Sequence, residues 1–387
     1  MTNELKNVPE LRFPEFDGEW EEKNLEEVSN KVTEKNRSNE LSETFTNSAE
    51  YGIISQQDYF DKAISNEKNL SNYYIVKKDD FVYNPRISNF APVGPIKRNK
   101  LNRSGLMSPL YYVFRTFNIN MDYIGTYFET IYWHKFMKLN GDSGARSDRF
   151  AIKDSVFQTM PIPYPIIEEQ QKIGEFFSKL DRQIELEEQK LEKLEEQKKG
   201  YMQKIFSQEL RFKDENGNDY PEWEIKKLMQ IAKVKTGSKN VQDNIQDGKF
   251  KFFDRSVEVK YLNTFDFDET AIIYPGEGSK FLPRYFSGKY SLHQRAYSIY
   301  DININNNYLY YYLSLQNNHF LKYAVGSTVK SLRMSGFDKL KVMVPKNSEQ
   351  EKIGDFFNEL DELIEKQSSK IGVLKQRKKG FLQKMFV

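Results

Sequence analysis

The 387-residue sequence contains no cysteine, only three histidines and almost no net charge. Without cysteine, disulfide bonds, cysteine-based zinc sites and a cysteine nucleophile are excluded. The histidines, His134, His293 and His319, lack the spacing of metal ligands. No apolar run approaches the roughly 18 residues of a membrane-spanning helix, and the first residues lack the apolar core of a signal peptide. We therefore expect a cytoplasmic protein that binds no metal.

Catalytic motifs are also scarce. Residues 276–280 (GEGSK) lack the glycine spacing of a phosphate-binding loop, and we interpret them as a turn. Asp254, Glu258 and Lys260 imitate a nuclease cluster, but such a match is expected by chance among 56 acidic residues. Residues 83–86 (YNPR) are similar to the adenine-methyltransferase tetrapeptide, but its last aromatic residue is replaced by arginine and no cofactor loop accompanies it. The sequence therefore predicts no catalytic residue.

The net charge of +2, from 58 basic and 56 acidic residues, hides a segregation of charge along the chain. Residues 81–121 carry six basic residues and no acidic one, and residues 321–347 carry six basic residues and one acidic one. Residues 168–200 are the reverse, with ten acidic and seven basic residues. The basic stretches are interleaved with Tyr, Phe, Asn and Ser, which favours nucleic-acid binding over ordinary solvated loops.

The chain is an internal duplication. Residues 170–206 and 350–386 align at a constant offset of 180 residues without a gap, from QxKIGxFFxxLD at the start to KKGxxQKxF at the end. The leading segments also match, PELRF at 9–13 with QELRF at 208–212, and each is followed by a tryptophan. Each half therefore consists of a leading segment, a variable body and a long helix.

Each long helix carries apolar residues at alternating spacings of four and three, which is typical of a coiled-coil seam. Gly200 and Gly380 lie either inside these helices or at their ends. We expect the two helices to pair with each other, and antiparallel if a twofold axis relates the halves; pairing with helices of another protein is the alternative. The apolar seam positions are Ile173, Phe177, Leu180, Ile184, Leu191, Leu194, Ile353, Phe357, Leu360, Ile364, Ile371 and Leu374.

The bodies are each large enough for one domain and mix strand and helix patterns, so the expected fold class is α+β. We predict strands at 73–76, 80–83, 110–115, 297–300 and 339–344, and helices at 121–137 and 307–321. We predict the following domains: a first recognition domain at 1–167, a first spacer helix at 168–207, a second recognition domain at 208–347 and a second spacer helix at 348–387.

The repeated helix motifs and the leading segments that end in Trp20 and Trp223 together resemble the specificity subunit of a Type I restriction-modification system, across essentially the whole chain. The resemblance implies two pseudo-symmetric target recognition domains separated by an antiparallel two-helix coiled-coil spacer. Each domain would read one half of a bipartite, asymmetric site in double-stranded DNA. A seam about 50 Å long corresponds to on the order of 15 base pairs.

The same resemblance implies a subunit without its own active site. Adenine methylation would occur on two modification (methyltransferase) subunits, and cleavage on restriction (nuclease/translocase) subunits. S-adenosylmethionine, ATP and Mg are expected on those partners and no cofactor on this chain. The alternatives are a coiled-coil adaptor whose two domains bind protein partners and a self-sufficient methyltransferase or nuclease.

Recognition residues do not transfer from the resemblance, because the target domains of this family vary. The candidates rest on residue type and position: arginine can pair with guanine O6 and N7, whereas lysine more often meets phosphate. An ordinary solvated charge is the alternative for each. The candidates are Arg86, Lys97, Arg98, Lys100, Arg103 and Arg146 in the first body, and Lys280, Arg284, Arg295, Lys330 and Arg333 in the second.

Overall fold

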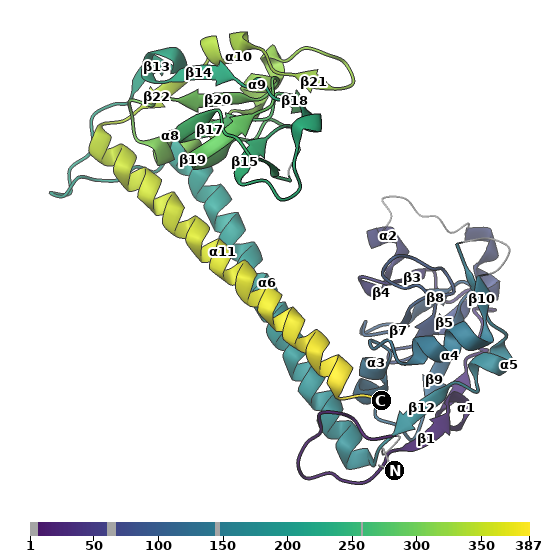
Figure 1. Cartoon of the computed structure of the whole chain (residues 1–387). Helices are drawn as coiled ribbons and strands as arrows, with labels where there is room; N and C mark the ends of the chain where they lie inside the picture. Colours follow the sequence, from purple (N-terminus) through teal and green to yellow (C-terminus); the bar gives the residue numbers. More distant parts are fainter. Residues whose placement is uncertain (1–6, 60–66, 144–147, 257) are drawn as a thin grey trace. The chain divides into compact units, whose positions relative to one another are not determined.

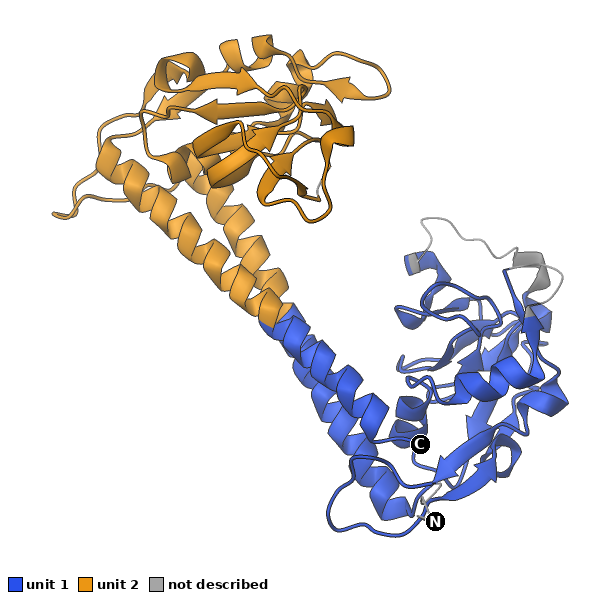
Figure 2. Ribbon diagram, viewed as in Figure 1, with its two compact units in different colours: residues 1–188, 370–387 blue, residues 189–369 orange. Residues whose placement is uncertain are grey.

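A computed structural model describes residues 7–59, 67–143, 148–256 and 258–387. These residues divide into two compact units (Figure 2). Unit 1 comprises residues up to Glu188 together with residues 370–387, and unit 2 comprises residues 189–369. Each unit thus contains one body and part of each long helix. The domain limits predicted from the sequence follow the ends of the helices instead and stay a prediction.

The duplicated segments form the two long helices, α6 (Ile167–Phe206) and α11 (Asn347–Lys384) (Figure 1). Gly200 and Gly380 lie inside them and not at their ends. Outside the helix's own backbone, an added Cβ on either glycine would meet no atom of the described residues within 4 Å. No helix in the described part of the chain is long and apolar enough to cross a membrane.

In unit 1 the two long helices run antiparallel. The rings of Phe176 in α6 and Phe381 in α11 have centroids 5.1 Å apart. Further along α6, Glu187 pairs at 2.8 Å with Lys370, which comes earlier in α11. The helices therefore pair within the chain, as predicted. They are antiparallel because later residues of α6 meet earlier residues of α11.

Unit 2 repeats this arrangement. Phe206 at the end of α6 stacks on Phe357 near the start of α11, with ring centroids 5.9 Å apart. Lys198 in α6 also forms an ion pair with Asp361 in α11. The apolar seam positions are buried or half-buried in their units: Ile173, Phe177, Leu180, Ile184, Leu191, Leu194, Ile353, Phe357, Leu360, Ile364, Ile371 and Leu374.

The body of unit 1 is built on a four-stranded antiparallel sheet with the order β2 (Ser29–Lys31), β9 (Tyr112–Thr116), β6 (Phe81–Tyr83), β7 (Ile96–Arg98). One face buries Phe81 and Phe114 against the helical side of the core, and the other packs Val82 and Val113 against Phe45. The other strands form four ladders: β1 (Glu21–Asn24) with β12 (Pro161–Tyr164), β3 (Phe45–Ser48) with β4 (Gly52–Ser55), β5 (Tyr74–Val76) with β8 (Gly105–Met107), and β10 (Asp142–Ser143) with β11 (Phe150–Ala151). The shorter helices are α1 (Leu25–Val28), α2 (Gln56–Tyr59), η1 (Glu67–Asn72), α3 (Met121–Tyr127), α4 (Trp133–Asn140) and α5 (Asp154–Phe157).

The body of unit 2 has a six-stranded sheet with the order β14 (Lys233–Thr236), β20 (Tyr297–Tyr300), β17 (Phe267–Tyr274), β19 (Arg284–Leu292), β15 (Phe250–Phe253), β16 (Lys260–Leu262). Its strands pair antiparallel except β15 with β19. Two further ladders join β13 (Glu224–Lys227) with β22 (Lys341–Val344) and β18 (Glu277–Gly278) with β21 (Lys330–Ser331). The shorter helices are α7 (Leu228–Ile231), η2 (Val241–Asp243), α8 (Asn306–Ser314), α9 (Asn317–Tyr323) and α10 (Met334–Asp338). Both bodies mix strands with helices, which confirms the predicted α+β class.

The two predicted body helices are wrong in the same way. Residues 121–137 form α3 and most of α4 with a break between them, and residues 307–321 span α8 and part of α9. At the first break, the Thr130 hydroxyl donates to the Tyr127 carbonyl at 2.7 Å. The turn lets Trp133 enter the core, where its indole N–H donates to the Phe128 carbonyl. An uninterrupted helix could not direct this ring inward.

The leading segments close each unit through equivalent hydrogen bonds. In unit 2 the Leu210 N–H donates to the Lys204 carbonyl at 3.0 Å, just after the end of α6. In unit 1 the Leu11 N–H donates to the Lys384 carbonyl at 2.8 Å. Leu11 corresponds to Leu210, and Lys384 to Lys204, in the two repeats. The same joint is therefore made between neighbouring residues in one unit and between distant residues in the other.

Candidate nucleic-acid interface

Each body is anchored to a long helix by a buried glutamate. Glu169 in α6 is fully buried and accepts hydrogen bonds from the Trp20 indole at 3.1 Å and from Arg12 at 2.7 Å. The hydrogen bond to Glu169 is the main cause of the raised pKa of Arg12. In unit 2 the buried Glu349 accepts from the Trp223 indole at 3.0 Å and, in the same way, from an arginine of the leading segment. The repeated leading segment thus holds its long helix in one orientation.

The next motif residue, a glutamine, fixes the first helix that packs on the long helix. Gln170 accepts from the Asn120 N–H at 2.9 Å and donates to the Pro165 carbonyl at 2.8 Å. Asn120 in turn caps α3, because its side chain accepts from the N–H groups of Asp122 and Tyr123. Unit 2 repeats these contacts with Gln350, Asn305 and Pro345. The bodies are therefore placed on the helices by the same device.

Three of the candidates in the first body are free of ion pairs within the described ranges: Arg86, Lys97 and Lys100. Arg86 is exposed on a segment that runs beside Arg149, to which its backbone is bridged. Lys97 lies on β7 and is half-buried, and burial lowers its pKa although Glu129 opposes the effect. These side chains are available to meet an anionic ligand.

Two other candidates already hold carboxylates. Arg98 donates to Asp122 at 2.6 Å. Arg103 makes two hydrogen bonds of 2.8 Å with Glu43, and this pairing lowers the pKa of the glutamate. A guanidinium occupied in this way must exchange its partner before it can read a base. Arg146 lies outside the described residues.

Four of the five candidates in the second body lie on or beside the β18–β21 ladder. Lys330 lies opposite Gly278 in this ladder, and Arg295 forms an ion pair with Glu277. Lys280 and Arg333 are exposed just beyond the ends of the two strands. The ladder also shows that Glu277 and Gly278 belong to a short strand, where the sequence had indicated only a turn.

Arg284 is placed differently. It begins β19 and is half-buried, and its guanidinium donates to the Ser256 carbonyl. This hydrogen bond gives Arg284 a structural role, because it ties the start of β19 to the segment at Ser256. Arg255, which the sequence analysis missed, is exposed and pairs with Glu277 at 3.4 Å. Arg255 and Arg295 both pair with Glu277. Nothing in the sequence around Arg255 indicates that it lies near Arg295.

Asp254 and Glu258, which imitate part of a nuclease cluster in the sequence, have different surroundings in the structure. Asp254 is buried and accepts hydrogen bonds from the Ser256 N–H at 2.8 Å and hydroxyl at 2.6 Å, and it also pairs with Lys260. Glu258 is exposed. In the described part of the chain, no group of three or more His, Cys, Asp or Glu side chains could hold a metal ion. Asp254 is therefore a structural carboxylate.

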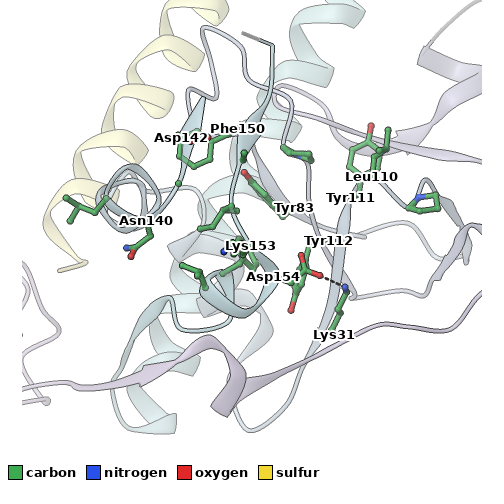
Figure 3. Close-up of a pocket in the computed structure, with 18 of the residues that line it drawn as sticks. Lys31, Tyr83, Leu110, Tyr111, Tyr112, Asn140, Asp142, Phe150, Lys153 and Asp154 are labelled. Carbon is green, nitrogen blue, oxygen red and sulfur yellow. Dashed lines mark hydrogen bonds and ion pairs between the residues drawn. The ribbon is translucent and has the colours of Figure 1, made fainter. Parts of the chain in front are cut away.

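A hollow of about 770 Å³ lies in the first body beside the β10–β11 ladder (Figure 3). Tyr83, Tyr112 and Phe150 line it, and Lys31 forms an ion pair with Asp154 at one side. Its lysines are accompanied by aspartates, so it lacks the one-signed charge expected of a site for DNA phosphates. None of the described basic candidates lines this hollow.

A sequence model of the Type I restriction modification DNA specificity domain matches residues 17–196 and 220–375. The Type I restriction enzyme EcoDI specificity subunit of Escherichia coli is 28% identical over 162 residues, which are 42% of this chain and 36% of the relative. The MjaIX specificity subunit of Methanocaldococcus jannaschii is 30% identical over 176 residues, 43% of this chain and 36% of the relative. The chain thus aligns with about a third of the length of these curated relatives.

Solved structures support the fold. The S subunit of a Type-I restriction-modification system from M. genitalium superposes with a TM-score of 0.61 at 13% identity, covering 98% of this chain and 99% of that one. A chain from a structure on complex assembly and conformational transition of the type I R-M system gives a TM-score of 0.56 at 13% identity, covering 95% and 97%. Because its two matched segments span most of its residues, the chain belongs to the family of the Type I restriction modification DNA specificity domain.

Proposed function

We propose that this chain is the DNA sequence-recognition subunit of a Type I restriction-modification complex. Each body reads one half of a bipartite, asymmetric site in double-stranded DNA. One observation carries the proposal: Glu169 and Glu349 anchor the two bodies in the same way, but the bodies present different basic groups. These come from β7 and its neighbours in unit 1, and from the β18–β21 ladder in unit 2. A repeated anchor with different surfaces suits two unlike half-sites.

The DNA contacts are proposed to come from Arg86 in the first body and from Lys280, Lys330 and Arg333 in the second. These side chains lie at the surface or half-buried, and within the described ranges no ion pair occupies them. Arg98, Arg103 and Arg295 would join them only after release from their carboxylates. Arginine would read guanine edges and lysine would hold phosphates.

Catalysis is assigned to partners. Two modification subunits would methylate a flipped-out adenine with S-adenosylmethionine, and restriction subunits would use ATP and Mg. This chain would contribute no catalytic residue, and the complex would act in the cytoplasm. The absence of a catalytic motif in the sequence and the structural role of Asp254 support this division of labour.

Methylation mapping tests the proposal. The gene is expressed with the modification subunit of its own system, and methylated adenines are mapped across the genome. We expect one bipartite motif with an unspecified gap. Exchanging residues 20–165 for the corresponding body of a relative should change one half of the motif and leave the other half intact. One uninterrupted motif that survives replacement of either body would contradict the proposal.

A further inference from the structure

A notch of about 350 Å³ opens in unit 1 where three segments distant in the sequence meet. They are the segment from Phe90 to Lys97, the α3–α4 connection around Ile131, and the later turns of α11. We call this hollow the Lys97 notch. Its charged lining side chains are those of Lys97, Glu129, Lys375, Lys378 and Lys379. The last helix of the chain thus brings three lysines to the first body.

Lys378 is neutralised inside the notch. Its ammonium pairs with Glu129 at 2.6 Å and with Asp181 at 2.5 Å. Burial alone would raise the pKa of Glu129, but Lys378 reverses the effect and the pKa is lowered. Lys375 has an exposed ion pair with Glu188 at 2.6 Å. These three carboxylates are therefore already assigned to cations.

The remaining lysines leave a surplus of positive charge. Within the described ranges, neither Lys97 nor Lys379 has an ion pair. His134 also lines the notch, and burial lowers its pKa to about 4, so that it is neutral at pH 7. The Lys97 ammonium is half-buried, and nearby Glu129 offsets only part of the effect of burial, so a bound anion would recover free energy. The notch is thus suited to a negatively charged group.

Phe90 stands at the edge of the notch with 81% of its surface exposed, the highest value among the large apolar side chains of the described residues. It lies on a tight turn in which Ser88 and Ala91 exchange two backbone hydrogen bonds of 3.1 Å. Ile131, on the α3–α4 connection, is 67% exposed. The fold therefore presents apolar groups beside the unpaired ammonium groups.

We propose that the Lys97 notch binds the sugar–phosphate backbone of the DNA, with a phosphate between Lys97 and Lys379 and a deoxyribose against Phe90. This rests on the proposed function and adds a contact made by the last helix. Phosphate and sugar together match the mixed lining, and such contacts position a protein without reading sequence. In the first repeat, Lys379 corresponds to Lys199 but Lys375 corresponds to Glu195, so the positive charge of this part of α11 is only partly repeated in α6.

The test measures DNA affinity against salt, with the full chain in complex with its modification subunit and a labelled 40-base-pair duplex of random sequence. Loss of one phosphate contact should reduce the slope of log K against log salt by about 0.9. Because the two lysines hold one phosphate, Lys97→Gln/Lys379→Gln should lower the slope by about 0.9 and weaken random and recognised duplexes by the same factor. The single variant Lys379→Gln, at an exposed position, should lower the slope by less than the double variant.

Two controls separate the notch from net charge. Lys179→Gln/Arg182→Gln removes the same charge from exposed positions of α6 in unit 1 and should leave the slope unchanged. Phe90→Ala should weaken both duplexes about fivefold, the effect of one modest apolar contact. Equal slopes in the control and notch variants would overturn the proposal. So would 2-aminopurine fluorescence that reports unstacking by Phe90, because the ring would then lie between bases.

Failure of this proposal is distinguishable from failure of the proposed function. If the wild-type complex shows no salt-dependent DNA binding, the proposed function itself fails. If the wild type binds and the notch variants keep its slope, only the notch proposal fails. Loss of the modification subunit from the notch variants, with an unchanged slope, would assign the notch to an acidic protein segment and also overturn it.

Discussion

Gly174 lies so close to Asn120 that a Cβ on the glycine would be 2.8 Å from the Asn120 side-chain oxygen. In unit 2 the equivalent distance, from Gly354 to Asn305, is 2.9 Å. Both asparagines cap the first helix that packs against a long helix. The glycine in each KIG motif is therefore a point of close approach, where body and helix touch.

Alanine at this point should destabilise the protein. Gly174→Ala and Gly354→Ala force the cap away from the helix, which should cost about 1–3 kcal/mol of unfolding free energy. Gly200→Ala and Gly380→Ala are matched controls inside the same helices, where an added Cβ meets no neighbour. They should stabilise the protein by about 0.5–1 kcal/mol. Urea denaturation measures all four, and equal effects at both pairs of sites would contradict the contact.

Removing the charge of the buried Glu169 should also lower the free energy of unfolding. Glu169→Gln leaves Arg12, whose side chain is only 13% exposed, without its charge partner, which should cost about 3 kcal/mol. Hydrogen exchange resolved by peptide should show faster exchange in unit 1 and unchanged rates in unit 2. Glu349→Gln should give the converse pattern. A uniform change across both units would show that the anchors are not local.

Among the ion pairs that join the long helices are Lys198 with Asp361 in unit 2 and Lys378 with Asp181 in unit 1. Swapping the two charges should restore stability more fully in the first pair than in the second. In unit 2, Lys198→Asp with Asp361→Lys should recover about 1 kcal/mol of the loss caused by the single variants. In unit 1, Lys378→Asp with Asp181→Lys should recover less, because Glu129 would then face an aspartate. Double-mutant cycles of thermal unfolding measure both coupling energies, and equal recovery would contradict the role of Glu129.

An aspartate placed in the apolar seam should lower the free energy of unfolding more at a more deeply buried position. Leu374 is 7% exposed, whereas Leu194 is only half-buried. Leu374→Asp should therefore cost at least about 3 kcal/mol, and Leu194→Asp clearly less. Circular dichroism during urea denaturation gives the ranking. A reversed order would place the seam on another face of the helices.

His134 predicts a pH dependence in unit 1. Burial lowers its pKa from 6.5 to about 4, so the unfolded chain binds a proton there before the folded one does. Its contribution is fully present above pH 6.5 and is lost as the pH falls through about 4. His134→Gln should flatten the dependence of unfolding free energy on pH across this window. Urea midpoints at several pH values measure it, and an unchanged slope would exclude His134 as the source.

The parts of the fold that could be predicted are those with a clear residue pattern, namely the duplicated helices and the strands rich in aromatic and β-branched residues. The seam spacing identified both long helices, and the aromatic and β-branched segments predicted as strands at 73–76 and 297–300 contain β5 and β20. The breaks after α3 and α8 were not predicted, because Phe128 and Ile131 continue an apolar helical pattern across the first break. The helix is interrupted there because Trp133 packs into the core, and this packing depends on residues from distant parts of the sequence.

The candidate site was predictable only in part. Residue type identified the cations, but it could not show that Arg98 meets Asp122, or that Arg103 meets Glu43 sixty residues earlier. Sequence distance hides such pairs, and also the fact that Lys379 and Lys97 line the same notch. A usable signal was missed at Gly174, because a glycine in the same interior position of both long helices disfavours the helix and therefore requires a reason.

The joint between Leu11 and Lys384 bears on how the protein is made. Unit 2 is one continuous segment, residues 189–369, so all of it exists before residue 370 is synthesised. Unit 1 needs residues 370–387 to complete its core, where Phe386 packs against Trp20 and Tyr123. The body translated first is thus completed last. Until then it exposes the apolar surface that α11 later covers, and this surface is available to misassembly or to chaperones during synthesis.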